Sequence, residues 1–443
     1  MQKNVEYPRV LIIGQGFNLV DGGGITLTNL FKGYPKNQLA LATNERKSIN
    51  PDVCENYYIL GSLEDYWVWP FSYIKRTGKA SGPVSINAIN DGFSFENKDP
   101  GPTISRSTFY TIINILGIED LSRRLKVSQQ FLEWVKAFSP DLIYSQLASL
   151  SLIRFIDNLS KKMQIPSVIH MMDDWPSTIY RHGLFSAYMR WRTDVEFRRL
   201  IARSTTLGIS QAMSDEYKDR YGKEFLPFHN PVDLDIWLMN SKKTWEVGSP
   251  FKVRYGGRIG KAIQESILDI AEAIEEINNG GLPVTFDLYI DLSENEFMNK
   301  LKKYKSANVY AKLPYEEVPI STAAADLLVI PYDFDRQSFQ FIQYSMSTKV
   351  SESMASGTPI LVYAPEETAV AKYARNEKWG CVVSQRNKTL LKQMIIQLIQ
   401  NPDLRESLGL RAKVLVSQNQ DAVKVRAHLR QVLVGATKSL ANS

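Results

Sequence analysis

The stretch STKVSESMASGTPILVYAP, residues 347–365, follows the apolar run DLLVIPY at 326–332, and together they decide the fold. Small hydroxyl residues open a helix at Ser347, and Gly357 stands where a left-handed residue ends it. A strand, a helix and a strand in this order predict the repeating unit of a doubly wound α/β sheet. Because such sheets bind ligands at the carboxyl ends of their strands, we expect Lys349 and the backbone amides of this helix to line a ligand cleft.

The same alternation continues through almost the whole chain. Short apolar runs of strand length are separated by amphipathic stretches of helix length. The predicted strands are 10–14, 38–43, 141–146, 167–173, 205–210, 224–230, 252–258, 284–290, 308–313, 326–332, 359–364 and 380–383. They fall into two series joined by the polar, turn-rich segment 230–250. We therefore predict an α/β fold with two doubly wound, Rossmann-like domains that face a cleft.

The domain boundaries follow from the same pattern. We assign residues 1–235 to an N-terminal domain and residues 236–415 to a C-terminal domain. The helix-rich end, residues 416–443, is expected to pack back on the first domain. Residues 62–105 mix aromatic residues with Gly, Pro and Asn and have no clear period, so they predict an insertion. Its aromatic residues favour a binding surface, with a partly ordered surface segment as the alternative.

The composition is typical of a soluble globular protein, with 44% hydrophobic and 23% charged residues among 443. No apolar run reaches the roughly 18–20 residues that span a bilayer, and the first residues lead into a strand without a signal-peptide pattern. Two distant cysteines, Cys54 and Cys381, predict a reducing, cytoplasmic compartment. The four histidines lack zinc-ligand spacing. A net charge of +6 suits a phosphorylated ligand or an anionic membrane surface, but it is too small to indicate a nucleic-acid partner.

A second candidate for phosphate binding is RVLIIGQGFNLVDGGG, residues 9–24. It begins like a dinucleotide-binding turn, but Leu19 stands where that fingerprint needs its third glycine. Gly22, Gly23 and Gly24 follow instead, directly before a helical pattern. A glycine-rich turn that feeds a helix can present N–H groups to an anion, and a tight turn without a ligand is the alternative.

Several segments in order resemble one large family. K-x-x-E-x-M-A-S-G-T-P-I-L from Lys349, preceded by A-A-A-D-L-L-V-I-P, resembles the donor site of retaining glycosyltransferases with the GT-B fold, of the group 1, family 4-like type found in bacterial surface-polysaccharide assembly. GGGITLTNL, SVIHMMDDWP, TTLGIS, HNPVD and YGGRIGK resemble further segments in the family's order. The resemblance covers about residues 9 to 400 and implies an acceptor-side first domain and a nucleotide-sugar-binding second domain.

The resemblance implies a donor site built on the second domain. Glu352 matches the glutamate that holds both ribose hydroxyls, and a carboxylate can accept two such hydrogen bonds. Arg258 matches the arginine that neutralises the diphosphate, and the turn at 347–348 offers N–H groups to the β-phosphate. The implied donor-binding residues are Gly23, Gly24, Arg258, Lys261, Ser347, Thr348 and Glu352, and the implied catalytic residues are His170, Arg258 and Lys349.

Contacts with the sugar or the acceptor are implied less directly. His170 matches a histidine beside the transferred sugar, and a buried core histidine is the alternative. Asp173 and Asp174 follow it in the same segment. Tyr344 stands where the family usually has a second glutamate on the donor sugar, which leaves open whether activity is altered or lost.

The spacing around the arginine also departs from the family. The family's lysine lies five residues after the arginine, at the position of Ile263 here, whereas Lys261 lies only three residues after Arg258. Asp333 and Asp335 resemble the Asp-x-Asp metal site of the other major glycosyltransferase fold, but in this architecture we interpret them as loop residues. We expect no bound cofactor and no metal requirement.

The implied reaction moves a hexose-type sugar from a nucleoside-diphosphate sugar to a glycan or lipid-linked acceptor, with retained configuration. A nucleotide-sugar epimerase of the same fold and a non-catalytic nucleotide- or glycan-binding partner are the alternatives. The stretch 181–204 is rich in arginine and aromatic residues and predicts a helix that lies at the inner face of a membrane, with a core role for its apolar side as the alternative.

Overall fold

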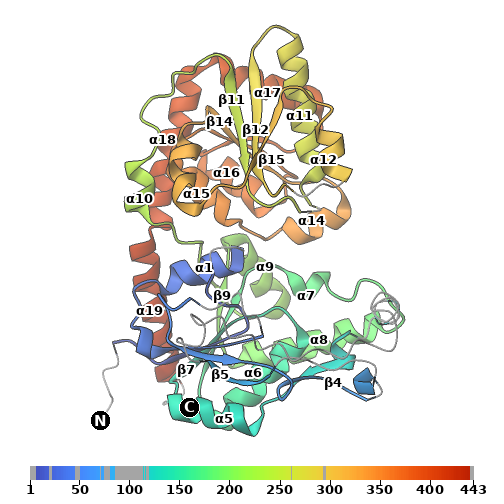
Figure 1. Ribbon diagram of the computed structural model, residues 1–443, viewed down its shortest axis with the longest axis vertical. Coiled ribbons are helices and arrows are strands. Elements are labelled where there is room, and N and C mark those ends of the chain that lie inside the picture. Colours follow the sequence, from blue (N-terminus) through green and yellow to red (C-terminus); the bar gives the residue numbers. More distant parts are fainter. Residues whose placement is uncertain are drawn as a thin grey trace. The chain divides into compact units, whose positions relative to one another are not determined.

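The computed structural model describes residues 6–18, 22–44, 50–69, 71–73, 80–84, 113, 115, 119–260, 262–292 and 296–439. The chain forms two compact units, one of residues 1–228 together with 426–443 and the other of residues 229–425. In each unit, strands lie side by side in a sheet and helices pack around it (Figure 1). The predicted fold of two Rossmann-like α/β domains is confirmed.

The first unit is built on a sheet whose described strands follow the order β10-β9-β8-β7-β1-β2-β3-β5. Its strands are β1 (Val10–Ile13), β2 (Leu39–Thr43), β3 (Asn56–Ile59), β5 (Gly82–Val84), β7 (Leu142–Gln146), β8 (Ser167–Met171), β9 (Thr205–Gly208) and β10 (Leu226–Pro227). All neighbouring pairs are parallel except β3 and β5. A separate antiparallel pair joins β4 (Asp65–Trp67) to β6 (Arg123–Leu125). This pair includes the described start of the predicted insertion, much of which lies outside the described residues.

The helices of the first unit cover both faces of this sheet, so its central strands are completely buried. They are α1 (Gly22–Phe31), α4 (Glu119–Ser122), α5 (Gln129–Phe138), α6 (Leu150–Met163), α7 (Trp175–Thr178), α8 (Ser186–Ala202) and α9 (Gln211–Tyr221), with 3₁₀ turns η1 (Lys36–Gln38) and η3 (Phe71–Tyr73). The hydroxyls of Ser128, Ser149 and Ser210 cap α5, α6 and α9. Each capping serine marks the point where a strand or loop turns into a helix.

The C-terminal helix, α19 (Ala422–Ser439), brings the end of the chain to the first unit. Arg426 Nε donates a hydrogen bond of 2.7 Å to the Asn29 carbonyl, which lies on α1. The ring of His428 stacks on Phe228, with 4.7 Å between the ring centroids. These contacts attach the last part of the chain to the N-terminal sheet.

The second unit contains a fully parallel sheet, whose described strands follow the order β13-β12-β11-β14-β15-β16. Its strands are β11 (Phe251–Gly256), β12 (Val284–Ile290), β13 (Ala307–Ala311), β14 (Leu327–Pro331), β15 (Ile360–Tyr363) and β16 (Cys381–Val383). The chain moves outward from β11 to β13 and then returns to place β14 on the other side of β11. The point between β11 and β14 is therefore the topological switch point, where open α/β sheets bind ligands.

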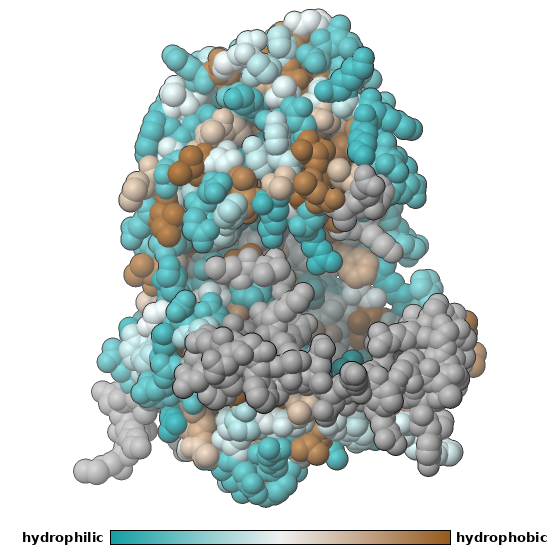
Figure 2. All heavy atoms as spheres, in the orientation of Figure 1, coloured by the Kyte–Doolittle hydropathy of each residue, from teal (hydrophilic) through white to brown (hydrophobic). Residues whose placement is uncertain are grey.

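Helices surround this second sheet as well. They are α10 (Leu234–Met239), α11 (Gln264–Asn279), α12 (Glu296–Leu301), α13 (Val318–Ala323), α14 (Arg336–Ile342), α15 (Thr348–Ser356), α16 (Ala369–Glu377), α17 (Lys388–Gln400) and α18 (Pro402–Asn419), with the 3₁₀ turn η4 (Tyr315–Glu317). Apolar side chains of α11 and α17 share one core with the strands. On the face of this unit seen in Figure 2, small apolar groups are scattered among hydrophilic residues, as is normal for a folded surface.

Candidate functional site

The predicted residues of the second unit gather around the switch point. Arg258 directly follows the β11 segment, and α15 lies beyond β14 on the neighbouring strand connection. The Ser347 hydroxyl accepts a hydrogen bond of 3.3 Å from the Lys349 N–H and caps α15, whereas Gly357, with a φ of 70°, ends it. The Val350 N–H donates to the Ser347 carbonyl at 3.0 Å. The N-terminal end of α15, at Thr348, carries the positive end of the helix dipole, which attracts anions.

The Lys349 side chain contacts the end of β11 through a hydrogen bond and a cation–π contact. Its Nζ donates a hydrogen bond of 2.7 Å to the Tyr255 hydroxyl and lies 4.6 Å from the centroid of the same ring. The Tyr255 hydroxyl in turn donates to the Arg258 carbonyl at 2.9 Å. A single phenol therefore joins the helix that carries Lys349 to the loop that carries Arg258.

Gly257 makes this contact sterically feasible. Its φ of 128° lies in the region that favours glycine, and a Cβ there would lie 2.2 Å from Lys349 Cε and 2.4 Å from Nζ. Any side chain at Gly257 would displace the lysine stem. Gly257 thus has a packing function that the spacing of the motif does not reveal.

Glu352 lies one turn after Lys349 on the same face of α15, and its side chain is half-buried. Burial raises its pKa to about 7, while a hydrogen bond with Tyr315 and the charges of Lys349 and Lys312 oppose this rise. Burial also lowers the pKa of Lys349 to about 8, and the charge of Glu352 opposes that shift. Both groups therefore titrate near neutral pH, as ligand-binding groups in sites that exclude water often do.

Arg258 and Tyr344 differ in their exposure to solvent. Arg258 is exposed, and within the described ranges no carboxylate forms an ion pair with its guanidinium. Lys261 lies outside the described residues. Tyr344 is half-buried in the turn between α14 and α15, three residues before the Ser347 cap.

The Asp-x-Asp stretch serves two helix N-termini. Asp333 is 2% exposed and accepts a hydrogen bond of 2.7 Å from the Ser266 N–H in the first turn of α11. Asp335 caps α14 by accepting from the Gln337 and Ser338 N–H groups at 2.9 and 3.0 Å. Across the part of the chain that the structure describes, no group of three or more His, Cys, Asp or Glu side chains could hold a metal ion.

In the first unit, His170 lies at the end of β8 and is fully buried. Its Nδ1 is 2.6 Å from the Tyr144 hydroxyl, whereas its Nε2 is buried without a hydrogen-bond partner among the described residues. Burial lowers the pKa of His170 to about 3, so the ring is neutral at physiological pH. It could give a ligand one hydrogen bond, but it does not supply a positive charge.

The two aspartates after β8 have different environments. Asp174 is 3% exposed and accepts hydrogen bonds from the Tyr217 hydroxyl at 2.8 Å and from Arg220 at 2.8 and 3.1 Å. These contacts tie α9 to the loop and give Asp174 a structural task. Asp173 is exposed.

The three glycines lie inside α1 and not in a turn before it, because this helix begins at Gly22. A Cβ on Gly24 would lie 2.2 Å from Asn18 Nδ2, and one on Gly23 would lie 3.1 Å from Gln15 Cδ. The loop after β1 therefore folds closely over the first turn of α1, and this approach requires glycine.

A family model matches part of this second unit. Residues 293–415 match the model described as Glycosyl transferases group 1. The matched span lies within the second unit. The matched span contains Lys349 and Glu352, and it begins after Arg258.

Solved structures resemble the whole chain in fold. A glycosyltransferase from Rickettsia africae has a TM-score of 0.61 at 12% identity, over 99% of this chain and 100% of that one. Sucrose-phosphate synthase from Thermosynechococcus elongatus has a TM-score of 0.59 at 12% identity, over 98% and 100%. Anabaena HepE, solved with UDP and glucose, has a TM-score of 0.57 at 14% identity, over 97% and 100%. These similarities establish the GT-B fold, and no curated protein matches the sequence.

Three residues around this candidate site were not singled out by sequence reasoning. Tyr255 and Gly257 lie in the YGGR segment that drew attention only to its arginine. Tyr315, which forms a hydrogen bond with Glu352, stands in a short 3₁₀ turn with no recognisable pattern. The sequence signal available for Tyr255 and Gly257 was a tyrosine at the end of a strand, followed directly by two glycines.

Proposed function

We propose that the protein is a retaining glycosyltransferase that moves a hexose-type sugar from a nucleoside-diphosphate sugar to a glycan or lipid-linked acceptor. The proposal rests on the contact between α15 and the Tyr255–Arg258 loop at the switch point. Lys349 on α15 makes this contact, and Glu352 lies one turn after it on the same helix. Structures of similar fold support the donor class, because HepE was solved with UDP-glucose. Another structure of similar fold, WaaG, is a glycosyltransferase involved in lipopolysaccharide biosynthesis. We therefore extend the proposal to surface or exopolysaccharide synthesis.

In the proposed donor complex, each group has one task. Glu352 accepts hydrogen bonds from the two ribose hydroxyls, for which its two oxygens suffice. Arg258, Lys349 and the first-turn amides of α15 bind the diphosphate and stabilise the charge that grows on it as the sugar leaves. The acceptor attacks from the side of the leaving diphosphate, which takes the acceptor's proton, so no pair of catalytic carboxylates is needed.

A panel of nucleoside-diphosphate sugars tests this proposal. Slow release of nucleoside diphosphate from one donor supports a transferase, and NMR of the transferred sugar should show a retained anomeric configuration. A donor converted to its epimer would instead favour the epimerase, and binding without turnover would favour a non-catalytic role. We propose that turnover needs no divalent metal, so EDTA should leave the rate unchanged.

We further propose that the protein contacts the inner face of a membrane through α8 and the residues before it. No helix within the described ranges is long and apolar enough to cross a bilayer. Leu184, Phe185, Tyr188 and Trp191 are 78, 44, 44 and 60% exposed, whereas Met189 is buried. One side of the segment is therefore core, and the other presents aromatic residues next to arginines, as interfacial helices do.

A further inference from the structure

The sheet of the second unit ends at a strand that is open on one side. β13 is last in the sheet order, and among the described strands it pairs only with β12. It has five residues, whereas β5, β10 and β16, the other described strands at the ends of the two large sheets, have two or three. None of its residues is buried. An open edge of this kind can accept a further strand.

The backbone of β13 has hydrogen-bonding groups on its open side. The Phe286 N–H of β12 donates to the Ser306 carbonyl at 2.8 Å. Because alternate residues of a parallel strand face its neighbour, every second residue after Ser306 continues this row. Val309 and Ala311 therefore turn their N–H and C=O groups away from β12, and within the described residues these groups have no hydrogen-bond partner.

A row of stacked side chains leads to this edge. The Arg254 guanidinium lies 4.1 Å from the centroid of the Tyr289 ring. Tyr289 stacks on Tyr310, with 5.0 Å between the ring centroids and 23° between the ring planes. The three residues stand on β11, β12 and β13 in that order, and Tyr310 is 42% exposed. An aromatic side chain on an added strand would extend this row.

Positive charge gathers at the amino end of the open edge. Lys303 and Lys305 are exposed directly before β13. The charge of Lys305 reaches Glu275, whose carboxylate is already bound to the Ser306 N–H and hydroxyl at 2.8 and 2.6 Å. The strand itself reads ANVYA and carries no charge. A negatively charged segment would therefore be attracted to this end of the edge.

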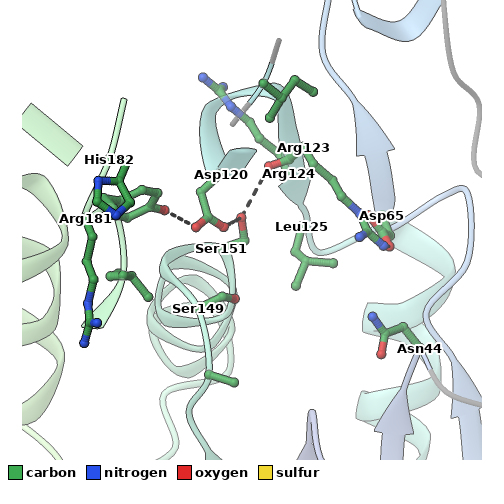
Figure 3. A pocket seen from close by; sticks show the side chains of 14 residues that line it. Asn44, Asp65, Asp120, Arg123, Arg124, Leu125, Ser149, Ser151, Arg181 and His182 are labelled. Atoms are coloured by element: carbon green, nitrogen blue, oxygen red, sulfur yellow. Dashed lines mark hydrogen bonds and ion pairs between the residues drawn. The ribbon is translucent and has the colours of Figure 1, made fainter. Parts of the chain in front are cut away.

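The small sheet of the first unit differs, because its charges are paired within the chain. It borders a cavity of about 680 Å³, which Figure 3 shows. There Arg123 of β6 lies against Asp65 of β4, and Arg123 Nε donates to the carboxylate at 2.6 Å. Lys303 and Lys305 form no such ion pair in the described part of the chain, so their charges remain available to a partner.

A second copy of the chain fits this edge poorly. Antiparallel pairing of two β13 strands, centred on Val309, would bring Lys305 of one copy close to Lys312 of the other. Like charges that face each other across two strands destabilise the pair. The edge therefore favours a strand of opposite charge.

We propose that β13 binds an extended acidic segment of a partner protein as an added strand. Main-chain hydrogen bonds to Val309 and Ala311 hold the segment, and an aromatic residue in it covers Tyr310. Acidic residues beside the aromatic one face Lys303 and Lys305. None of these residues belongs to the proposed donor site, so the proposal is independent of the transfer reaction.

Fluorescence anisotropy on the full chain tests this with three labelled peptides. They are DETVYVTDE, the lysine-flanked KKTVYVTKK, and DETVYVTDE with its five central amides N-methylated. At low salt we expect the acidic peptide to bind about tenfold more tightly than the lysine peptide, because two surface charge pairs together contribute that much. High salt should reduce this difference. N-methylation should abolish binding, since it removes the main-chain donors of the added strand.

Two variants of the strand test the contacts. Val309→Pro should abolish binding of the acidic peptide, because proline removes an outward N–H and leaves the ladder with β12 in place. Tyr310→Ser should weaken binding about fivefold, since the ring contact is lost. Thermal melting checks that the proline variant is folded, and if it is not, the methylated peptide tests the same hydrogen bonds on the unaltered chain.

Lys303→Glu with Lys305→Glu should reverse the preference between the acidic and the lysine peptide. Arg124→Glu with Lys136→Glu makes the same change in net charge at two exposed positions of the first unit and is the matched control, which should keep the preference. Figure 3 shows Arg124 beside the cavity of that unit.

Three results would overturn the proposal. The first is absent binding or equal affinity for the three peptides, in which case the lysines only keep other strands away from the edge. The second is a preference that survives the change of Lys303 and Lys305. The third is a dimer of the unaltered chain that Val309→Pro dissociates, which would assign the edge to a second copy.

Discussion

Glu352 and Lys349 lie one helical turn apart, and the proposed donor site gives each a separate role. Their spacing places them on one face of α15, and both titrate near neutrality because the same surroundings bury them. A partly buried carboxylate beside a partly buried ammonium is costly to maintain. In the proposed donor complex, ribose hydroxyls and phosphate oxygens reduce this cost.

Glu352→Ala should weaken the binding of UDP by about 100-fold, because two charge-assisted hydrogen bonds are lost and their effects add incompletely. Calorimetry measures the affinity, and circular dichroism checks that the fold is intact. Glu377→Ala, at an exposed carboxylate on α16, is the control and should bind normally. Unchanged affinity in the Glu352 variant would remove this residue from the site.

The affinity for a UDP-sugar should depend on pH with a maximum between about 7 and 8. Glu352, with a pKa near 7, must be ionised to accept hydroxyl protons, so binding weakens as the pH falls below this value. Lys349, with a pKa near 8, loses its charge as the pH rises further, which weakens the attraction to the diphosphate. Titration calorimetry from pH 5.5 to 9 measures the profile. Glu352→Gln should flatten the acid limb only, and a variant that keeps the full acid limb would contradict this assignment.

Tyr255→Phe should lower UDP affinity about five- to tenfold, because the ring remains under Lys349 while the hydroxyl that positions the ammonium is lost. The same measurement on Tyr304→Phe, a half-buried tyrosine after α12, provides the control. A loss of thermal stability without a change in affinity would show that Tyr255 supports the fold alone.

At the scale of elements, α8 has one buried face and one exposed face. Its buried side chains, Met189 and Phe197 among them, pack in the first unit, so this side is core as the alternative interpretation holds. Arg198 and Arg199 are already paired with Asp194 and Glu196 on the same helix. Arg198 and Arg199 should therefore contribute less to binding an anionic membrane surface than the sequence implies. The exposed aromatic residues are the stronger candidates for membrane contact.

Flotation with vesicles that contain anionic lipid should carry the protein upward at low salt and less at high salt. Leu184→Ser with Trp191→Ser should reduce the floated fraction severalfold, because these are the most exposed apolar groups of the segment. The control variant is Leu410→Ser, which removes an exposed leucine on α18, outside the proposed membrane segment. The membrane proposal fails if wild-type protein does not float at low salt or if the double variant floats equally.

At the scale of the whole molecule, each strand predicted from apolar periodicity has a counterpart in the two sheets. The strands that were not predicted are β3, inside ENYYIL, and the three-residue strands β4, β5 and β6. Three residues contain too little periodic pattern to distinguish a strand from a loop, and pairing with a partner decides their conformation. The helix start at Gly22 was missed because three consecutive glycines are poor helix formers, and the close approach of Asn18 to Gly24 is a tertiary contact that the local pattern does not record.

The sequence by itself determined the two sheets, the helix α15 and the placement of Lys349 and Glu352 on it, because each depends on local periodicity and capping. Only the tertiary structure decided that Tyr255 holds Lys349, that Asp333 accepts from the first turn of α11, and that Asp174 is tied to Arg220. The cavity beside β4 and β6 belongs to this second group. Asp65, Asp120, Ser151 and Tyr180 come from separate segments, and no pattern along a chain records which segments a fold brings together.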